Sequence, residues 1–306
     1  AWRQWASLGA SALKGQKGDA QAIADPEALL LMSLYLEPAE RRLRDFTRWW
    51  AGVGSELLSV QRTKTLLRRF PPETEERLQA FAGWAMEAGD KRWRRYAPDG
   101  SEAGTSERNM DRGRKGADRP RLHASPALMV RLRAGFGVSA KADVLAFLLG
   151  INESAVSTQE TADATSYSRA TVRGALSDMT RAGFIRETGN RSARYFAPTE
   201  PWGRLLSFGD RSNAADGAAP DRVPAWRYWS GLYAFLAATD RWARDEDDSS
   251  GYVLSSRARD TFEKHKPAFE RNRIEVPRPE EYRGADYLEG FEETVRVLIH
   301  WMAGHV

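Results

Sequence analysis

The stretch from residue 157 to residue 198 constrains the fold of this chain more than any other. Two helical patterns, at residues 157–164 and 168–181, are joined by only the three residues 165–167. A connection of this length is typical of a helix-turn-helix unit, in which two short helices pack across each other. Ala162 stands at the expected crossing, where a small side chain lets the helices approach closely.

Local signals mark where these two helices begin and end. Ser157 and Glu160 have the spacing of a reciprocal capping box, in which each side chain bonds the backbone N–H of the other residue. Gly183 follows the second helix, where a left-handed cap is favoured. The buried stripe of the second helix is predicted to consist of apolar residues at helical spacing, namely Val172, Leu176 and Met179.

A β-hairpin is predicted directly after the second helix. The segments "FIRE" and "ARYFA" alternate apolar and polar residues, as half-buried strands do. Gly189 and Asn190 between them permit the positive φ of a hairpin turn. Such a hairpin would place Arg191 and Arg194 on a projecting loop. A further short extended piece is expected around Val156.

The second helix carries a polar and basic surface opposite its apolar stripe. Arginine can bridge O6 and N7 of guanine in the major groove, and Ser or Thr can bond phosphates or base edges. A basic hairpin tip can touch the DNA backbone or enter the adjacent minor groove. The candidate DNA-binding residues are therefore Ser166, Ser168, Arg169, Thr171, Arg173, Ser177, Arg191 and Arg194.

Three segments between Ser139 and Pro198, "KADVLAFLLG", "STQETADATSYSRATVRGALSDMTRAGFI" and "TGNRSARYF", carry a resemblance to a known family. In their order and types they resemble the winged helix-turn-helix domains of bacterial MarR- and ArsR-type transcriptional regulators, over roughly a fifth of the chain. The resemblance implies a homodimer on a palindromic operator and a DNA-reading helix that begins at Ser168. The readout positions that it implies are Ser168, Arg169, Thr171 and Arg173, with Arg191 on the wing.

The chain also departs from these compact regulators. About 120 residues precede the predicted winged helix-turn-helix domain and about 100 follow it. The Cys pairs of the metal-sensing members are absent, so metal sensing is not expected.

We predict a mainly α-helical chain with a central winged helix-turn-helix flanked by helical bundles. Amphipathic patterns predict four short helices within residues 25–89 and three more after residue 221. The segment 97–122 has almost no large apolar side chains and cannot offset the entropy of ordering, which favours a flexible basic linker. The expected parts are an N-terminal helical domain (1–96), this linker, the winged helix-turn-helix domain (123–200) and a C-terminal helical domain (201–306) for dimerisation or for binding an effector or partner.

Composition and missing motifs narrow the functional classes. The chain has no Cys and four scattered His, so no metal site is expected. Without a catalytic or nucleotide-binding motif, we expect neither enzyme activity nor a cofactor. No apolar run reaches the ~18–20 residues of a membrane span and no secretory signal is visible, so we expect no membrane partner and a cytoplasmic location. Residues 91–123 carry ten Lys and Arg against five Asp and Glu, which favours a polyanionic partner.

Two basic segments each leave two interpretations open. The segment "SVQRTKTLLRRF" places Arg62, Lys64, Arg68 and Arg69 on the outside of a helix. They form either a second DNA-contacting surface or a solvated face, and we favour the solvated face. The basic residues of the linker could follow phosphates or simply be solvated; they are Arg108, Arg112, Arg114, Lys115 and Arg119.

Two further patterns lie in the C-terminal third. An aromatic group could line an effector pocket, although aromatic residues at helical spacing more often form a core or a dimer interface; its members are Trp226, Tyr228, Trp229, Tyr233 and Phe235. The acidic run at 244–250 lacks the spacing and glycine of a calcium loop and is expected to be a solvated turn.

These patterns favour a sequence-specific DNA-binding transcription regulator, expected to act as a homodimeric repressor. One alternative is a winged-helix module that docks onto a protein partner. Another is a DNA-binding subunit of a genome-defence or maintenance complex without a regulatory role.

Overall fold

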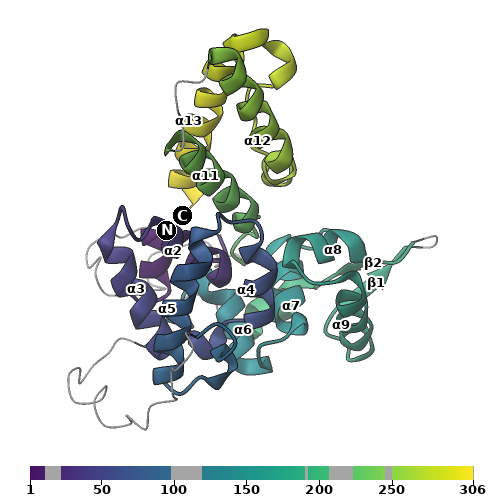
Figure 1. The fold of residues 1–306 in the computed structure, drawn as a ribbon. Helices are drawn as coiled ribbons and strands as arrows, with labels where there is room; N and C mark the ends of the chain where they lie inside the picture. Colours follow the sequence, from purple (N-terminus) through teal and green to yellow (C-terminus); the bar gives the residue numbers. More distant parts are fainter. Residues whose placement is uncertain (11–21, 98–118, 190–191, 207–222, 245–249, 306) are drawn as a thin grey trace, which may run out of the picture.

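The computed structural model describes residues 1–10, 22–97, 119–189, 192–206, 223–244 and 250–305. These residues form a mainly α-helical protein whose described part contains one small antiparallel sheet of two strands (Figure 1). The expectation of a mainly α fold is therefore confirmed. Most of the predicted linker, residues 98–118, lies outside the described residues.

The N-terminal third is helical, as its amphipathic patterns predict. Its central helix α2 is buried along its whole length except at Leu36, because other helices surround it. Asp25 caps α2 by accepting a hydrogen bond from the Ala28 N–H, and Pro26 occupies the first helical position, where its missing N–H costs nothing. The helices are α1 (Trp2–Ser7), α2 (Pro26–Leu36), α3 (Arg41–Val53), α4 (Val60–Leu67) and α5 (Glu73–Glu87).

The middle of the chain contains the predicted helices and hairpin. Tyr195 pairs with Glu187 on one side and makes an isolated bridge with Val156 on the other, so the extended piece around Val156 is confirmed. Helix α10, which begins two residues before Pro201, was not expected. The elements are α6 (Leu128–Phe136), α7 (Ala140–Gly150), α8 (Thr158–Thr165), α9 (Arg169–Arg181), β1 (Arg186–Thr188), β2 (Arg194–Phe196) and α10 (Thr199–Leu206).

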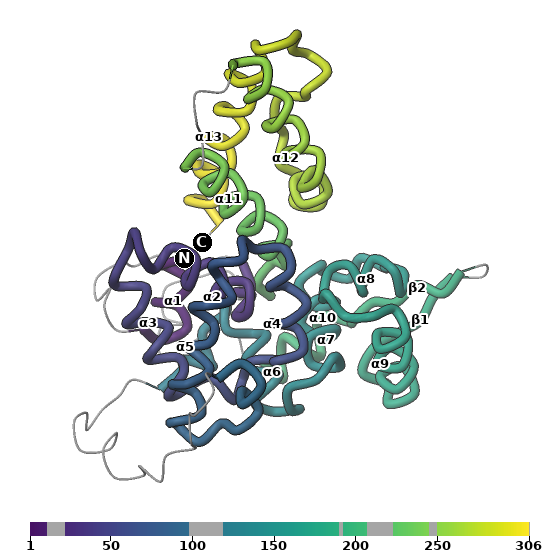
Figure 2. Tube along the Cα trace, viewed as in Figure 1, coloured from purple at the N-terminus to yellow at the C-terminus, as the bar shows by residue number. Residues whose placement is uncertain are grey.

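The C-terminal third forms the three expected helices, α11 (Trp229–Arg244), α12 (Gly251–Asn272) and α13 (Tyr287–His305). Figure 1 shows α12 and α13 projecting away from the rest of the protein, with α11 leading into this lobe. The two chain ends lie close together (Figure 2), and Arg3 donates a hydrogen bond to the Ala303 carbonyl oxygen at 2.9 Å.

The N-terminal and C-terminal helices share one hydrophobic core, although the sequence led us to expect two separate domains. Buried aromatic side chains from both ends of the chain, including Trp5, Trp50, Trp229 and Phe235, belong to a single cluster. Polar contacts join the same segments, since the Trp229 indole N–H donates to the Ile23 carbonyl oxygen at 2.9 Å. The second cluster lies among α6–α10 and contains the apolar faces of α7 and α9.

Candidate nucleic-acid interface

The α8–α9 unit is built by local hydrogen bonds that the sequence predicts. Ser157 and Glu160 form the reciprocal capping box at the start of α8. At the start of α9, the Ser168 side chain accepts from the Thr171 N–H at 3.1 Å. Gly183 follows α9 with φ +75°, as a left-handed cap requires. The apolar stripe of α9, formed by Val172, Leu176 and Met179, is buried as expected.

The turn between α8 and α9 depends on Ser166. Its φ of 60° and ψ of 31° lie in the left-handed region, which residues other than glycine seldom adopt. Ser166 is only 7% exposed, and its hydroxyl has no hydrogen-bond partner among the described atoms. The structure therefore places this candidate contact residue beneath the surface, away from any ligand that approaches α9.

The other candidate residues of this unit lie together on the exposed side of α9. Ser168, Arg169, Thr171, Arg173 and Ser177 are all exposed. Within the described part of the chain, Arg169 and Arg173 make no ion pair. Asp178, by contrast, is paired with both Lys141 (2.7 Å) and Arg181 (3.1 Å). The first two turns of α9 therefore present two available guanidiniums at the positive end of the helix dipole.

Of the two arginines predicted on the hairpin loop, the structure describes only Arg194. Arg191 lies outside the described residues. Arg194 does not project from a loop: it belongs to β2 and is half-buried. Its Nε and Nη2 atoms donate to the Ala155 carbonyl oxygen at 3.0 and 2.6 Å, and Nη2 lies 3.5 Å from Glu160 Oε2. We therefore correct its expected role, because Arg194 holds the hairpin against the start of α8.

A buried ion-pair cluster lies behind the turn. Arg62 binds both oxygens of Asp25 at 2.6 Å and one oxygen of Glu27 at 2.5 Å. Arg133 contacts both oxygens of Asp143 at 2.7 Å and the remaining oxygen of Glu27 at 2.5 Å. These five side chains, which come from the α2 region, α4, α6 and α7, are at most 5% exposed.

Hydrogen bonds on either side of Ser166 connect this cluster to the turn. Arg62 Nε donates to the Thr165 carbonyl oxygen at 2.9 Å, and the Tyr167 hydroxyl donates to Asp143 Oδ2 at 2.8 Å. Burial and the adjacent Asp143 raise the pKa of Tyr167, which keeps its hydroxyl protonated as a donor. The start of α9 is thus fixed to the N-terminal helices through its connecting turn.

Our expectation that Arg62 lies on a solvated face is wrong, because its side chain is fully buried. Burial opposes its charge, but the Asp25 and Glu27 carboxylates outweigh burial and raise the pKa of Arg62. Arg68 and Arg69, which directly follow α4, are exposed, and Lys64 within α4 is half-buried. The missed signal was Glu27, the one charged residue of the helix "PEALLLMSLYL". A charge in a helix that is buried along its length needs an oppositely charged partner.

The structure also describes the aromatic group, and parts of the basic linker and of the acidic run, that the sequence singled out. Trp226, Trp229, Tyr233 and Phe235 are core residues, and Trp226 also lines a cavity together with Tyr228. Arg119 is exposed, and the other four basic residues of the linker lie outside the described ranges. The acidic run also falls mostly outside them, at residues 245–249.

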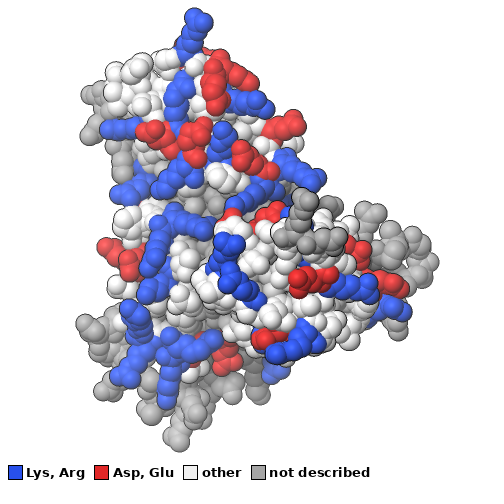
Figure 3. Space-filling view, turned by 90° about the vertical axis from the view of Figure 1, so that its right-hand side faces the viewer, with Lys and Arg blue, Asp and Glu red and all other residues white. Residues whose placement is uncertain are grey.

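Charges of both signs alternate on the side of the protein that carries α8, α9 and the hairpin. Figure 3 shows Lys and Arg interspersed with Asp and Glu over the described part of this face. A ligand at α9 would therefore be held by individual side chains more than by a broad positive field.

Comparison with protein-family models, with curated proteins and with solved structures finds no match to this chain. Function is therefore inferred from the residues themselves. Among the helices that the structure describes, none combines the length and the apolar character needed to cross a bilayer.

Proposed function

We propose that this chain is a sequence-specific DNA-binding transcription regulator, in which residues 157–197 act as a winged helix-turn-helix. The observation that carries the proposal is the exposed start of α9. There, Arg169 and Arg173 stand without ion-pair partners in the described structure, beside Ser168 and Thr171. The hairpin extends beside α9 (Figure 1), where a wing would meet the flanking DNA backbone.

In this mechanism α9 enters the major groove. Arg169 and Arg173 bond guanine edges, while the Ser168 and Thr171 hydroxyls and the first N–H groups of α9 bond phosphates. The buried cluster behind the turn keeps α9 at a fixed angle to the N-terminal helices. The chain acts as a homodimeric repressor on a palindromic operator, and covering the promoter excludes the polymerase.

The first experiment is recovery and sequencing of fragmented genomic DNA bound by the full chain, in about 150 mM salt with excess non-specific competitor. We expect an inverted-repeat motif near a promoter. Motif-free recovery across the genome would instead favour the genome-defence or maintenance role. No recovery would refute DNA binding.

Substitutions on α9 then test which residues read the motif. Arg169→Ala and Arg173→Ala should each weaken specific binding by about 1–3 kcal/mol, roughly tenfold to a hundredfold in Kd. The matched control is Arg257→Ala, an exposed arginine on the distant helix α12, which should leave binding unchanged. Unchanged specific binding by both α9 variants would refute the assignment of α9.

A protein-docking role is the second candidate, and an exposed aromatic cluster favours it. Phe136, Phe184 and Trp202 contact one another through their rings, yet Phe136 and Phe184 remain 49% and 42% exposed. Docking through this cluster predicts a protein complex that survives the salt concentrations at which DNA binding is lost.

A further inference from the structure

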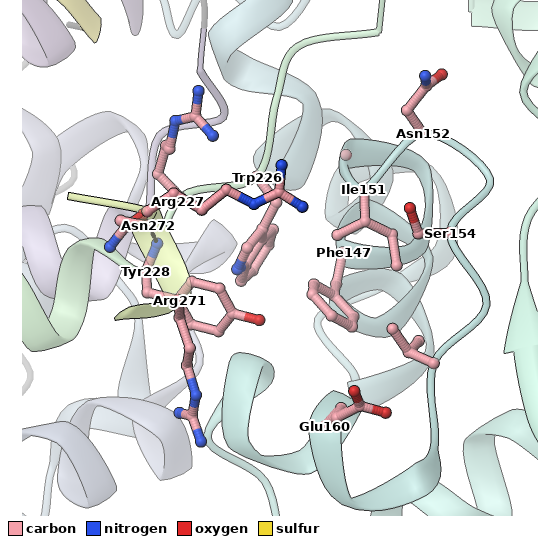
Figure 4. Close-up of a pocket in the computed structure, with 13 residues that line it drawn as sticks. Phe147, Ile151, Asn152, Ser154, Glu160, Trp226, Arg227, Tyr228, Arg271 and Asn272 are labelled. Atoms are coloured by element: carbon pink, nitrogen blue, oxygen red, sulfur yellow. Dashed lines mark hydrogen bonds between the residues drawn. The ribbon is translucent and has the colours of Figure 1, made fainter. Parts of the chain in front are cut away.

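A cavity of about 430 Å³ lies where the C-terminal helices meet the end of α7 and the start of α8. One wall is apolar, formed by Phe147, Ile151 and Trp226, and the Phe147 and Trp226 rings meet edge to face at 5.3 Å. Figure 4 shows the Arg227 guanidinium and the Tyr228 hydroxyl pointing from the opposite side into the space beside this wall.

The cavity carries more positive charge than its own carboxylates neutralise. Three arginines line it, and only Arg271 has an ion pair with a described carboxylate, Asp163 at 2.7 Å. Arg227 lies over the Trp301 ring at 5.6 Å, and burial together with the charge of Arg273 lowers the pKa of Arg227. Arg227 is half-buried and Arg273 is exposed, and two cations that repel each other favour an anion between them.

The carboxylate that lines the cavity is already engaged. Glu160 accepts from the Ser157 N–H at 2.7 Å as part of the α8 capping box, and it also lies 3.5 Å from Arg194. It therefore serves the start of α8 and does not neutralise Arg227 or Arg273.

Two buried donors at the cavity also lack acceptors. Trp226 is only 6% exposed, and its indole N–H has no hydrogen-bond partner among the described residues. The Nε atom of Arg227 is likewise buried and unpartnered there. An unpaired buried donor costs about 1–3 kcal/mol, so both groups favour a bound acceptor.

We propose that this cavity binds a small organic anion, with the acid group between Arg227 and Arg273 and the apolar body against Phe147 and Trp226. All three arginines belong to the C-terminal third, outside the stretch that resembles winged-helix regulators. The site also stands independently of DNA binding, because only the cavity's own residues are needed to form it.

The test is calorimetric titration of the full chain with three probes: 2-naphthoate, 1-naphthyl phosphate and the neutral analogue 2-naphthylmethanol. We expect at least one anionic probe to bind about tenfold more tightly than the alcohol, as charge-assisted hydrogen bonds require. The two anions distinguish a carboxylate ligand from a phosphate ligand.

Substitutions then locate the site. Arg273→Gln changes an exposed residue and should leave the fold intact, while removing the preference for the anion over the alcohol. Arg227→Gln should do the same, and Arg257→Gln on α12 serves as the matched control that keeps the preference. Equal affinity for anions and alcohol, no binding at all, or an unchanged preference in both Arg227→Gln and Arg273→Gln would overturn the proposal.

Discussion

Arg62 and Glu27 illustrate, at the scale of single residues, how burial changes the role of a charge. Each lies at 0% exposure, and each depends on the other and on Asp25 or Arg133 for charge balance. Removing one partner leaves another charge buried without compensation, which is far more costly than losing a surface ion pair.

Arg62→Ala is therefore expected to lower the free energy of unfolding by about 3–5 kcal/mol. The matched control is Arg68→Ala directly after α4, an exposed residue whose loss should change stability by about 0.5 kcal/mol or less. Urea denaturation followed by circular dichroism measures both values. Equal midpoints for the two variants would contradict the structural role of the cluster.

His265 is expected to make the free energy of unfolding depend on pH near neutrality. It is 8% exposed and hydrogen-bonded to the Thr261 carbonyl oxygen at 2.8 Å, and burial lowers its pKa below the ordinary 6.5. The unfolded chain consequently binds a proton at this residue that the folded chain does not, so stability falls as pH drops below about 6.5.

Unfolding free energies of the wild type and of His265→Gln, measured from pH 7.5 to pH 5.5, test this expectation. The variant should lose less stability over this range than the wild type, because the buried titrating group is gone. Identical pH profiles would show that His265 contributes nothing to the slope.

At the scale of elements, the turn between α8 and α9 contains a strained backbone position. Ser166 adopts a left-handed conformation with its hydroxyl buried and unpartnered within the described structure. Glycine adopts this conformation without a steric cost and brings no hydroxyl. The position is also the one residue of the predicted interface on α8–α9 that the structure places below the surface.

Ser166→Gly is therefore expected to preserve DNA affinity and to leave the chain equally stable or more stable, by up to about 1 kcal/mol. Ser166→Val should destabilise it, because a β-branched residue tolerates positive φ poorly. Thermal denaturation and an operator-binding assay measure the two effects. A large loss of DNA affinity in a stable Ser166→Gly variant would indicate that Ser166 contributes to DNA binding after all.

At the scale of the whole molecule, the winged-helix segment depends on residues distant in sequence. Glu27 binds Arg133, and Ile23 and Trp226 pack into the core formed by α6–α10. An ion pair between Arg271 and Asp163 also joins α12 to α8. The predicted domain limits of 123–200 therefore separate residues that pack together or form ion pairs in the structure.

A fragment of residues 123–206 should accordingly fail to fold cooperatively, although it contains every helix of the α6–α10 unit. It would expose apolar surface that Ile23 and Trp226 cover, and it would leave Arg133 without one of its two carboxylate partners. A thermal melt by circular dichroism, compared with that of the full chain, provides the measurement. A sharp, reversible transition in the fragment would show that the unit is autonomous.

The local structure was largely predictable because its causes lie within a few residues. The Asp25–Pro26 start of α2, the Ser157–Glu160 capping box and the cap at Gly183 all act over one helical turn. The same is true of the α9 face, where helical periodicity alone separates the exposed arginines from the buried Val172 and Leu176.

The contacts between distant segments follow from long-range packing and could not be predicted from the sequence. Arg62 and Arg68 look alike in sequence, yet only Arg62 meets carboxylates from α2, some 35 residues earlier in the chain. Tyr233 is likewise buried against Gln4, 229 residues away. The positions where helices begin and end, and the faces that they bury, could be read from sequence alone, because backbone hydrogen bonding and periodicity are local. Long-range packing decides which charges are buried and which helices share a core. A short window of sequence does not show this packing.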